Sequence, residues 1–342
     1  GIEQERLRPT EDGRPGALAD EVRRGVAHDG GAVGPIDIHV RNVRPQGVTE
    51  FPSDRIVILQ HGATYSSTAF DVPFAGLSWM QYLAQRGFDA YCLDLPGYGR
   101  STRPALMDAP ALDNPPYLRT ADAVCALASV VDFVRRRRAV ETLNLIGWSW
   151  GTSITACYAA DNPARVARLA LFAPVWDRRN SPSPIALDGP LGAYRIVSRK
   201  DAWDRKMAGV PEDRRDKLSP PGWFEQWADA TFAADQSGNG ETLRAPNGVL
   251  LDGREYWAAG RPLYDPARIT APTLLTVGEW DRDTPPFMAQ TIFPLLTGAA
   301  WKRLTVLGEG THSMVMEGNR MLLLRTVQQF LEEAPPGPDV LA

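Results

Sequence analysis

Residues 142–158 constrain the fold of this chain more than any other stretch. The first part is short and apolar, as in a buried strand, and the last part has small and apolar residues at helical spacing. Between them lies Gly147-Trp-Ser149-Trp-Gly151, which fits the pattern G-x-S-x-G. In this pattern a serine occupies a sharp strand-to-helix turn, and glycines flank it because side chains there would collide with neighbouring backbone. The stretch therefore predicts that Ser149 is an exposed nucleophile rather than a plain buried turn serine.

Strand-like and helix-like segments alternate along most of the chain. Strands are predicted at residues 55–60, 90–93, 142–146, 166–173, 273–277 and 302–307, and helices at residues 79–86, 120–138, 286–296 and 319–332. Residues 21–26 and 36–43 alternate in polarity, which predicts an antiparallel pair at the sheet edge. Thr120 is expected to be the N-cap of its helix. The alternation predicts an α/β fold with a mostly parallel central sheet flanked by helices.

The alternation stops over residues 177–265, which contain short helical pieces but no long buried strand. Structureless loops of this length are uncommon. We therefore expect a mainly helical cap, inserted after the sixth strand into a core formed by residues 20–176 and 266–334. Residues 1–19 are expected to form an N-terminal arm, and residues 335–342 a C-terminal tail.

Charge and composition exclude several classes of protein. The net charge is −4, so no global field favours nucleic acid or an anionic membrane, and no apolar run approaches the roughly 18–20 residues that span a bilayer. The arginines at 135–138 end a predicted helix, where they complement its dipole.

The three cysteines lie within predicted strands or helices, which predicts buried, reduced thiols. Since the four histidines are scattered, we expect no metal and no cofactor, and a cytoplasmic location by default.

The histidines offer one candidate base. A serine hydroxyl is a weak nucleophile near neutral pH and needs a base within hydrogen-bond reach, itself oriented by a third group. Only His312 follows Ser149 in the sequence, and it lies in a glycine-rich loop directly after a predicted strand. Loops at the carboxyl ends of parallel strands are where α/β folds build their sites. His312 is therefore the predicted base.

Carboxylates that could orient this histidine lie in two places. Glu279, Asp281 and Asp283 crowd the loop after residues 273–277, and Asp177 follows the sixth strand. A buried aspartate would fix the imidazole tautomer and stabilise the imidazolium. The residues alone leave the choice among these four open.

Several motifs make the chain resemble the α/β-hydrolases, in their serine-nucleophile, esterase-like branch with an inserted cap. They are His61-Gly62 after a strand, Asp94-Leu-Pro-Gly-Tyr-Gly-Arg-Ser101, Gly147-Trp-Ser-Trp-Gly151, Gly278-x-x-Asp281-x-x-x-Pro285 and Gly310-Thr-His312. The resemblance covers most of the chain outside the first 20 residues and the cap, and the family order of serine, acid and histidine is kept. It implies Asp281 as the acid, with Asp283 as runner-up, and the backbone N–H groups of Ala63 and Trp150 as an oxyanion hole.

The resemblance also implies a reaction class. A serine at the sharp strand-to-helix turn (the nucleophile elbow) implies acyl transfer through a serine ester. Epoxide hydrolases and haloalkane dehalogenases have an aspartate there instead. Hydrolysis of a carboxylic ester is the simplest such reaction. Thioester hydrolysis, C–C bond hydrolysis, acyl transfer to another alcohol and perhydrolysis use the same triad, and some members of the fold only bind ligands. Where many relatives have His-Gly-x-Pro, this chain has Thr64, which becomes a further donor candidate.

Aromatic residues predict an apolar substrate pocket of limited size. Half of the ten tryptophans fall between residues 176 and 265, and two more flank Ser149. We expect Trp148, Trp176 and Thr64 to line the pocket, with the ring of Trp150 near its wall. The expected partner is a small-molecule ester of aromatic or medium-chain alkyl type, and the protein is expected to be a monomer or homodimer.

Arginines in the predicted cap suggest a charged variant of this substrate. Arginine binds carboxylates through a planar, bidentate fork. The candidates are Arg178, Arg179, Arg195 and Arg199. A monoester of an aromatic dicarboxylic acid, such as a monoalkyl phthalate, is therefore one specific hypothesis.

Overall fold

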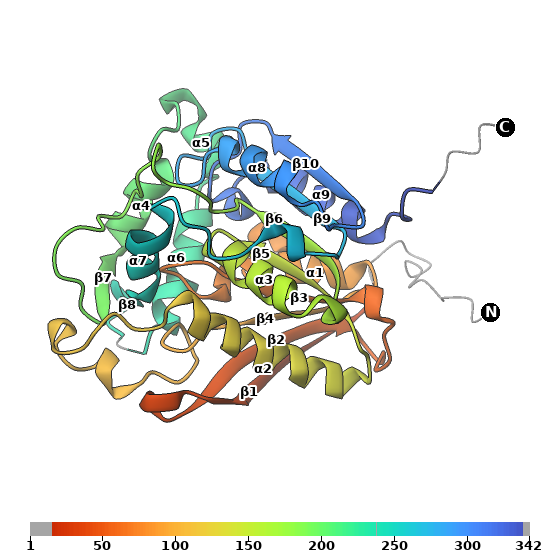
Figure 1. The fold of residues 1–342 in the computed structure, drawn as a ribbon, viewed down its shortest axis with the longest axis horizontal. Coiled ribbons are helices and arrows are strands. Elements are labelled where there is room, and N and C mark those ends of the chain that lie inside the picture. The colour runs from red at the N-terminus through yellow and green to blue at the C-terminus, as the bar shows by residue number, and fades with distance from the viewer. Residues whose placement is uncertain (1–15, 237, 338–342) are drawn as a thin grey trace.

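A central eight-stranded sheet organises the computed structural model, which describes residues 16–236 and 238–337 (Figure 1). Most of the predicted N-terminal arm and the end of the predicted C-terminal tail lie outside the described residues. The strand order is β1-β2-β4-β3-β5-β6-β9-β10. The strands are β1 (Leu18–Asp29), β2 (Pro35–Pro45), β3 (Ile56–Gln60), β4 (Asp89–Leu93), β5 (Leu143–Trp148), β6 (Val166–Phe172), β9 (Thr273–Gly278) and β10 (Lys302–Leu307).

The sheet is parallel except at one edge. β1 pairs with β2 in antiparallel fashion, as the alternating polarity of these two strands predicts. β2 also pairs with β4 in antiparallel fashion, which the sequence did not predict. From β4 through β3, β5, β6 and β9 to β10, every neighbouring pair is parallel. Every residue of β3, β5 and β9 is buried, which agrees with the mainly apolar sequences of these strands. The predicted mostly parallel α/β sheet is confirmed.

Helices cover both faces of this sheet. One hydrophobic cluster joins the sheet to α2, α3 and α8, and a second joins it to α1 and α9. The bounds are α1 (Trp79–Gln85), α2 (Thr120–Arg138), α3 (Trp150–Asp161), α8 (Pro286–Ile292) and α9 (Arg320–Glu332). None of the helices in the described part of the chain has the length and apolar character needed to cross a bilayer.

The segment between β6 and β9 forms a body of short elements beside the main sheet, coloured green to teal in Figure 1. Its elements are β7 (Tyr194–Ser198), α4 (Arg199–Met207), α5 (Arg215–Leu218), α6 (Trp223–Ala234), β8 (Thr242–Pro246) and α7 (Gly248–Asp252). β7 and β8 pair as a separate antiparallel sheet, which the sequence did not predict. The centre of β7 is exposed at Ile196, so the sequence has no buried apolar run that would indicate this strand. The division of the chain into core and cap domains stays a prediction.

Two local predictions are corrected. Arg119, not Thr120, is the N-cap of α2; Thr120 is the first helical residue, and its N–H donates to Asp252 Oδ2 at 2.6 Å. A carboxylate from α7 thus replaces the side-chain cap that Thr120 was expected to supply. All three cysteines are free, but only Cys92 is fully buried, whereas Cys125 is exposed because it lies on the outer face of α2.

Candidate active site

Ser149 occupies the sharp turn from β5 into α3. Its backbone has φ 58° and ψ −124°, a conformation that non-glycine residues rarely adopt and that stores strain. A Cβ at Gly147 would lie 2.4 Å from the carbonyl oxygen of Gly151, and a Cβ at Gly151 would lie 2.4 Å from that of Gln60. The two flanking glycines are therefore required by close backbone approach, as the sequence pattern predicts.

A continuous chain of hydrogen bonds joins three residues that are far apart in the sequence. Ser149 Oγ lies 2.8 Å from His312 Nε2, and His312 Nδ1 lies 2.9 Å from Asp281 Oδ2. The serine comes from the turn before α3, the aspartate from the loop after β9 and the histidine from the loop after β10. The structure thus brings together the predicted nucleophile, base and acid.

The surroundings of Asp281 hold it as a buried acceptor. Its side chain faces His312 from a site that is 3% exposed. The N–H of Thr284 donates to Asp281 Oδ1 at 2.8 Å, and Thr284 Oγ1 lies 2.9 Å from Asp281 Oδ2. Thr284 Oγ1 also donates to the carbonyl of Ala173 at 3.1 Å, which ties this loop to the end of β6. The sequence analysis missed this role of Thr284.

The other candidate acids lie elsewhere. Asp283 approaches the opposite nitrogen of the imidazole, with its Oδ2 3.8 Å from His312 Nε2, and it pairs with Arg205 at 2.7 Å. Asp177 forms an ion pair with the exposed side chain of Arg179. Glu279 accepts a hydrogen bond from the backbone N–H of Glu309. Of the four carboxylates, only Asp281 contacts His312 Nδ1.

Two aspartates set the protonation of His312. Burial disfavours the imidazolium, but the negative charges of Asp281 and Asp283 outweigh burial, so the pKa of His312 is raised. Arg205 opposes them weakly. A base must be neutral to accept a proton, so activity that depends on His312 should rise only as the pH passes this raised value.

We expect the Asp283→Asn variant to move the acidic limb of the pH profile of kcat/KM to lower pH, by about one unit. The variant removes a negative charge that stabilises the imidazolium and leaves Arg205 in place, so the pKa of His312 falls. The measurement is kcat/KM for an ester between acidic and neutral pH. A limb that stays in place or moves to higher pH would contradict this assignment of charges.

Ala63 and Trp150, the predicted oxyanion-hole residues, both border the smaller cavity together with Ser149. Trp150 is the first residue of α3, where backbone N–H groups have no partner within the helix. A Cβ at Gly62 would lie 2.8 Å from the carbonyl oxygen of Trp148 and 3.2 Å from the nitrogen of Trp150, so the loop after β3 packs directly on the elbow. Within the described part of the chain, neither N–H donates a hydrogen bond to a loop or side-chain acceptor.

His61 has a structural task in the same loop. Its Nε2 accepts a hydrogen bond from the N–H of Leu95 at 3.0 Å, so its Nδ1 carries the proton and donates to the carbonyl of Gly62 at 2.7 Å. Burial lowers the pKa of His61, which keeps this neutral form. His61 therefore fixes the loop that carries Ala63, and it does not contact Ser149.

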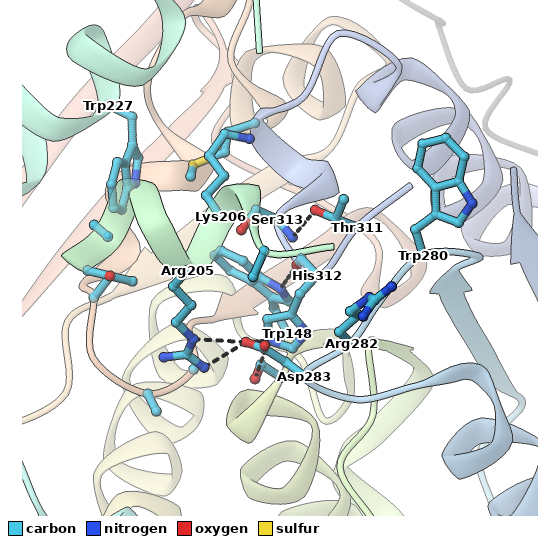
Figure 2. Close-up of a pocket in the computed structure, with 17 residues that line it drawn as sticks. Trp148, Arg205, Lys206, Trp227, Trp280, Arg282, Asp283, Thr311, His312 and Ser313 are labelled. Atoms are coloured by element: carbon cyan, nitrogen blue, oxygen red, sulfur yellow. Dashed lines mark hydrogen bonds and ion pairs between the residues drawn. The ribbon is translucent and has the colours of Figure 1, made fainter. Parts of the chain in front are cut away.

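Ser149 lies where two cavities meet. The larger holds about 750 Å³ of empty space, part of it open to solvent, and has aromatic walls from Tyr65, Trp148, Trp227 and Trp280. The three tryptophans are labelled in Figure 2. The smaller holds about 430 Å³, and Ala63 and Ser149 border both. Its apolar lining consists of Val175, Pro184, Ile185, Leu187, Val249, Leu250 and Trp257. Among the described residues, no group of three or more histidine, cysteine, aspartate or glutamate side chains could hold a metal ion.

The predicted pocket residues divide into two groups. Trp148 lines the larger cavity and donates from Nε1 to the carbonyl of His312 at 2.9 Å, so it also positions the base. Trp150 borders the smaller cavity, while its ring is 1% exposed and bonded through Nε1 to Thr120 Oγ1 at 2.9 Å. Thr64 and Trp176 line neither cavity, which corrects the prediction for both.

Packing explains the two corrections. The Thr64 hydroxyl accepts a hydrogen bond from Arg195, so it is turned away from the space above Ser149. The ring of Trp176 packs edge-on against Tyr264 at 5.3 Å. Both side chains are therefore committed to partners within the chain.

Charged residues that the sequence analysis did not single out also shape the site. Arg205 and Lys206, adjacent on α4, both line the larger cavity (Figure 2). Glu317 accepts hydrogen bonds from the N–H and the hydroxyl of Thr311 at 2.9 Å, which holds the loop next to His312. Lys206 Nζ lies 4.0 Å from Glu317 and has no hydrogen-bond partner in the described chain. No short-range pattern could have indicated Arg205 and Lys206, because their carboxylate partners, Asp283 and Glu317, are about 80 and 110 residues away in sequence.

Comparison with known proteins agrees with the fold. Residues 55–318 match the family described as alpha/beta hydrolase fold. A thermophilic esterase from Thermogutta terrifontis is 17% identical, covers 92% of this chain and 100% of its own, and has a TM-score of 0.59. The 2-hydroxy-6-oxo-6-phenylhexa-2,4-dienoate hydrolase from Rhodococcus sp. strain RHA1 is 15% identical, covers 92% of this chain and 100% of its own, and has a TM-score of 0.56. The thioesterase domain of the curacin biosynthetic pathway is 17% identical, covers 93% of this chain and 100% of its own, and has a TM-score of 0.57. No curated protein sequence matches the chain.

Proposed function

Since the chain belongs to the alpha/beta hydrolase fold family, we propose that it is a serine hydrolase that cleaves carboxylic esters through a covalent acyl-enzyme. The observation that carries this proposal is the hydrogen-bond chain Ser149–His312–Asp281, at the point where two cavities meet. An ester has two substituents on its reacting group, and two adjoining cavities can accommodate one each. The esterase among the similar structures is consistent with this reaction.

Acylation begins at Ser149. As Oγ forms a bond to the carbonyl carbon of the ester, its proton passes to His312 Nε2, which lies 2.8 Å away. The carbonyl oxygen becomes an oxyanion, which the N–H groups of Ala63 and Trp150 stabilise by roughly 3–4 kcal/mol each. Asp281 stabilises the imidazolium through Nδ1. The C–O bond to the alcohol then breaks, and the alcohol leaves with the proton from Nε2.

Deacylation repeats these steps with water. His312, now neutral, accepts a proton from water as the water oxygen attacks the acyl carbon. The second oxyanion collapses, the bond to Ser149 Oγ breaks, and Nε2 returns the proton to the serine. The net reaction converts one ester and one water into one acid and one alcohol, and no cofactor takes part.

The cavity walls favour small aromatic or medium-chain alkyl esters. The larger cavity is lined by four tryptophan and tyrosine rings, which suit a ring or a short chain. The smaller cavity is lined mainly by aliphatic side chains, and both are bounded by the segment between β6 and β9.

A series of p-nitrophenyl esters, from acetyl to dodecanoyl, tests this function. We expect turnover with an optimum at short or medium acyl length, and labelling of Ser149 by a fluorophosphonate probe. Boiled protein and protein labelled beforehand with the probe are the controls. Absence of labelling at a pH where His312 is neutral would refute the enzyme and favour a ligand-binding protein. Labelling without turnover of any ester would favour thioester, C–C or acyl-transfer chemistry.

A further inference from the structure

Arginine side chains outnumber carboxylates around the smaller cavity. Arg178 and Arg205 both line it, and Asp283 is the nearest carboxylate to both. Arg205 donates from Nε and Nη2 to Asp283 Oδ2, at 3.0 and 2.7 Å. Arg178 donates from Nη1 only to the backbone carbonyl of Asp283, at 2.6 Å. Together with the nearby Arg195, three guanidinium groups meet two carboxylates, Asp283 and Asp281, which leaves an excess of one positive charge.

Burial makes this excess costly. Arg178 is 8% exposed, and burial, together with the charge of Arg205, lowers its pKa to about 10. Arg195 lies nearby, and burial lowers its pKa to about 10 as well. It donates hydrogen bonds to neutral groups of Thr64, Pro246 and Asn247. A buried cation without a counter-ion is strongly disfavoured unless another contact compensates for it. A bound anion would supply this compensation.

The two arginines also have N–H groups to spare. In the described part of the chain, Arg205 Nη1 and Arg178 Nε and Nη2 donate no hydrogen bond, yet they are not sealed off from solvent-sized space. These groups belong to the wall of a cavity that also contains Ser149. Figure 2 shows the Arg205 guanidinium beside Asp283, with its remaining nitrogen turned away from that carboxylate. Planar guanidinium N–H pairs match the two oxygens of a carboxylate.

From these contacts we propose that the substrate carries an ionised carboxylate, which binds between Arg178 and Arg205, and that it is a monoester of a dicarboxylic acid. This inference rests on the proposed ester hydrolysis. One added negative charge neutralises the cluster, whereas a phosphate dianion would exceed it. The aliphatic walls accept the hydrocarbon part between the two acid groups. The proposal places the charge on the acyl side, where the arginines would hold the acyl group on Ser149 through both half-reactions.

Two p-nitrophenyl esters of equal acyl length test the inference. In p-nitrophenyl hydrogen glutarate the chain ends in a carboxylate, and in p-nitrophenyl pentanoate it ends in a methyl group. We expect kcat/KM to be at least about tenfold higher for the glutarate, since hydrogen bonds to charged groups contribute on this scale. In Arg178→Met this preference should fall by about 10- to 100-fold. Arg178→Lys, which keeps the charge without the fork, should lie between.

Arg179→Met is the matched control, because Arg179 is the next residue, is exposed and pairs with Asp177. It should keep the wild-type preference. Equal or faster turnover of the pentanoate by the wild-type protein would overturn the inference while leaving ester hydrolysis intact. Turnover of neither ester, without labelling of Ser149, would overturn both.

Binding provides a readout apart from turnover. Calorimetry of the Ser149→Ala protein should show tighter binding of monobutyl phthalate than of butyl benzoate, which lacks the carboxylate. Adding Arg178→Met should weaken binding of the phthalate by about tenfold or more, and adding Arg179→Met should not. Equal affinity of the two compounds, or an equal effect of the two arginine variants, would overturn the inference.

Discussion

Replacement of Ser149 by alanine is expected to lower kcat/KM for a cleaved ester by roughly five to six orders of magnitude. The variant removes the only hydroxyl within hydrogen-bond distance of His312 Nε2 among the described side chains, so no acyl-enzyme can form. The residual rate should come from the N–H groups of Ala63 and Trp150 and from substrate binding alone. The measurement is kcat/KM together with loss of fluorophosphonate labelling.

Ser153→Ala is the matched control for this variant. Ser153 lies one turn further along α3, is 1% exposed, and its hydroxyl has no hydrogen-bond partner in the described chain. Its removal should change kcat/KM by less than about threefold, because no polar contact is lost. Both variants should show the same cooperative unfolding. If Ser149→Ala kept more than about a hundredth of the wild-type rate, a different nucleophile would be required.

The elbow could be predicted from sequence because its constraints are local. A Cβ at Gly147 or Gly151 would lie 2.4 Å from a backbone oxygen, so the fold requires both glycines within five positions of one another. The strand before them is a short apolar segment, and the helix after them has small and apolar residues at helical spacing. Both can therefore be recognised in the sequence. His312 could be identified for a related reason: it is the only histidine after Ser149, and its loop follows a strand of a parallel sheet.

The substrate cavities could not be predicted in the same way. Arg205 faces Asp283 across 78 residues, and Trp227 faces Tyr65 across more than twice that separation, so no local spacing links them. Composition did suggest that arginines and tryptophans of this segment matter. It could not tell Arg178, which lines a cavity, from the exposed Arg179 beside it, nor Trp227 from Trp176. That distinction depends on how the segment between β6 and β9 folds back over the sheet.

The loop after β9 shows both the strength and the limit of a sequence motif. The glycine and proline frame favours Asp281, and the structure agrees, because only Asp281 contacts His312 Nδ1, at 2.9 Å. The frame says nothing of Asp283, whose charge also raises the pKa of His312 from the other side of the ring. Two carboxylates therefore act on one imidazole, but only Asp281, which contacts Nδ1, can fix its tautomer.

This difference predicts that Asp281→Asn lowers kcat by about four orders of magnitude, far more than Asp283→Asn does. An amide at position 281 can donate to Nδ1, and the proton of the neutral imidazole then moves to Nε2. A protonated Nε2 can no longer accept the proton of Ser149. Asp283→Asn leaves the contact at Nδ1 intact, so we expect a loss of about tenfold or less, together with the shift of the pH profile described above.

The two variants are matched in size, in charge change and in position within one loop, so their ratio isolates the tautomer from electrostatics. Binding of a non-hydrolysed ester analogue should separate the effects further. Asp283→Asn frees Arg205 from its partner and should alter affinity for a carboxylate-bearing ligand, whereas Asp281→Asn should not. A larger loss of kcat in Asp283→Asn than in Asp281→Asn would mean that the orienting acid is Asp283, and that the contact of Asp281 with Nδ1 is only structural.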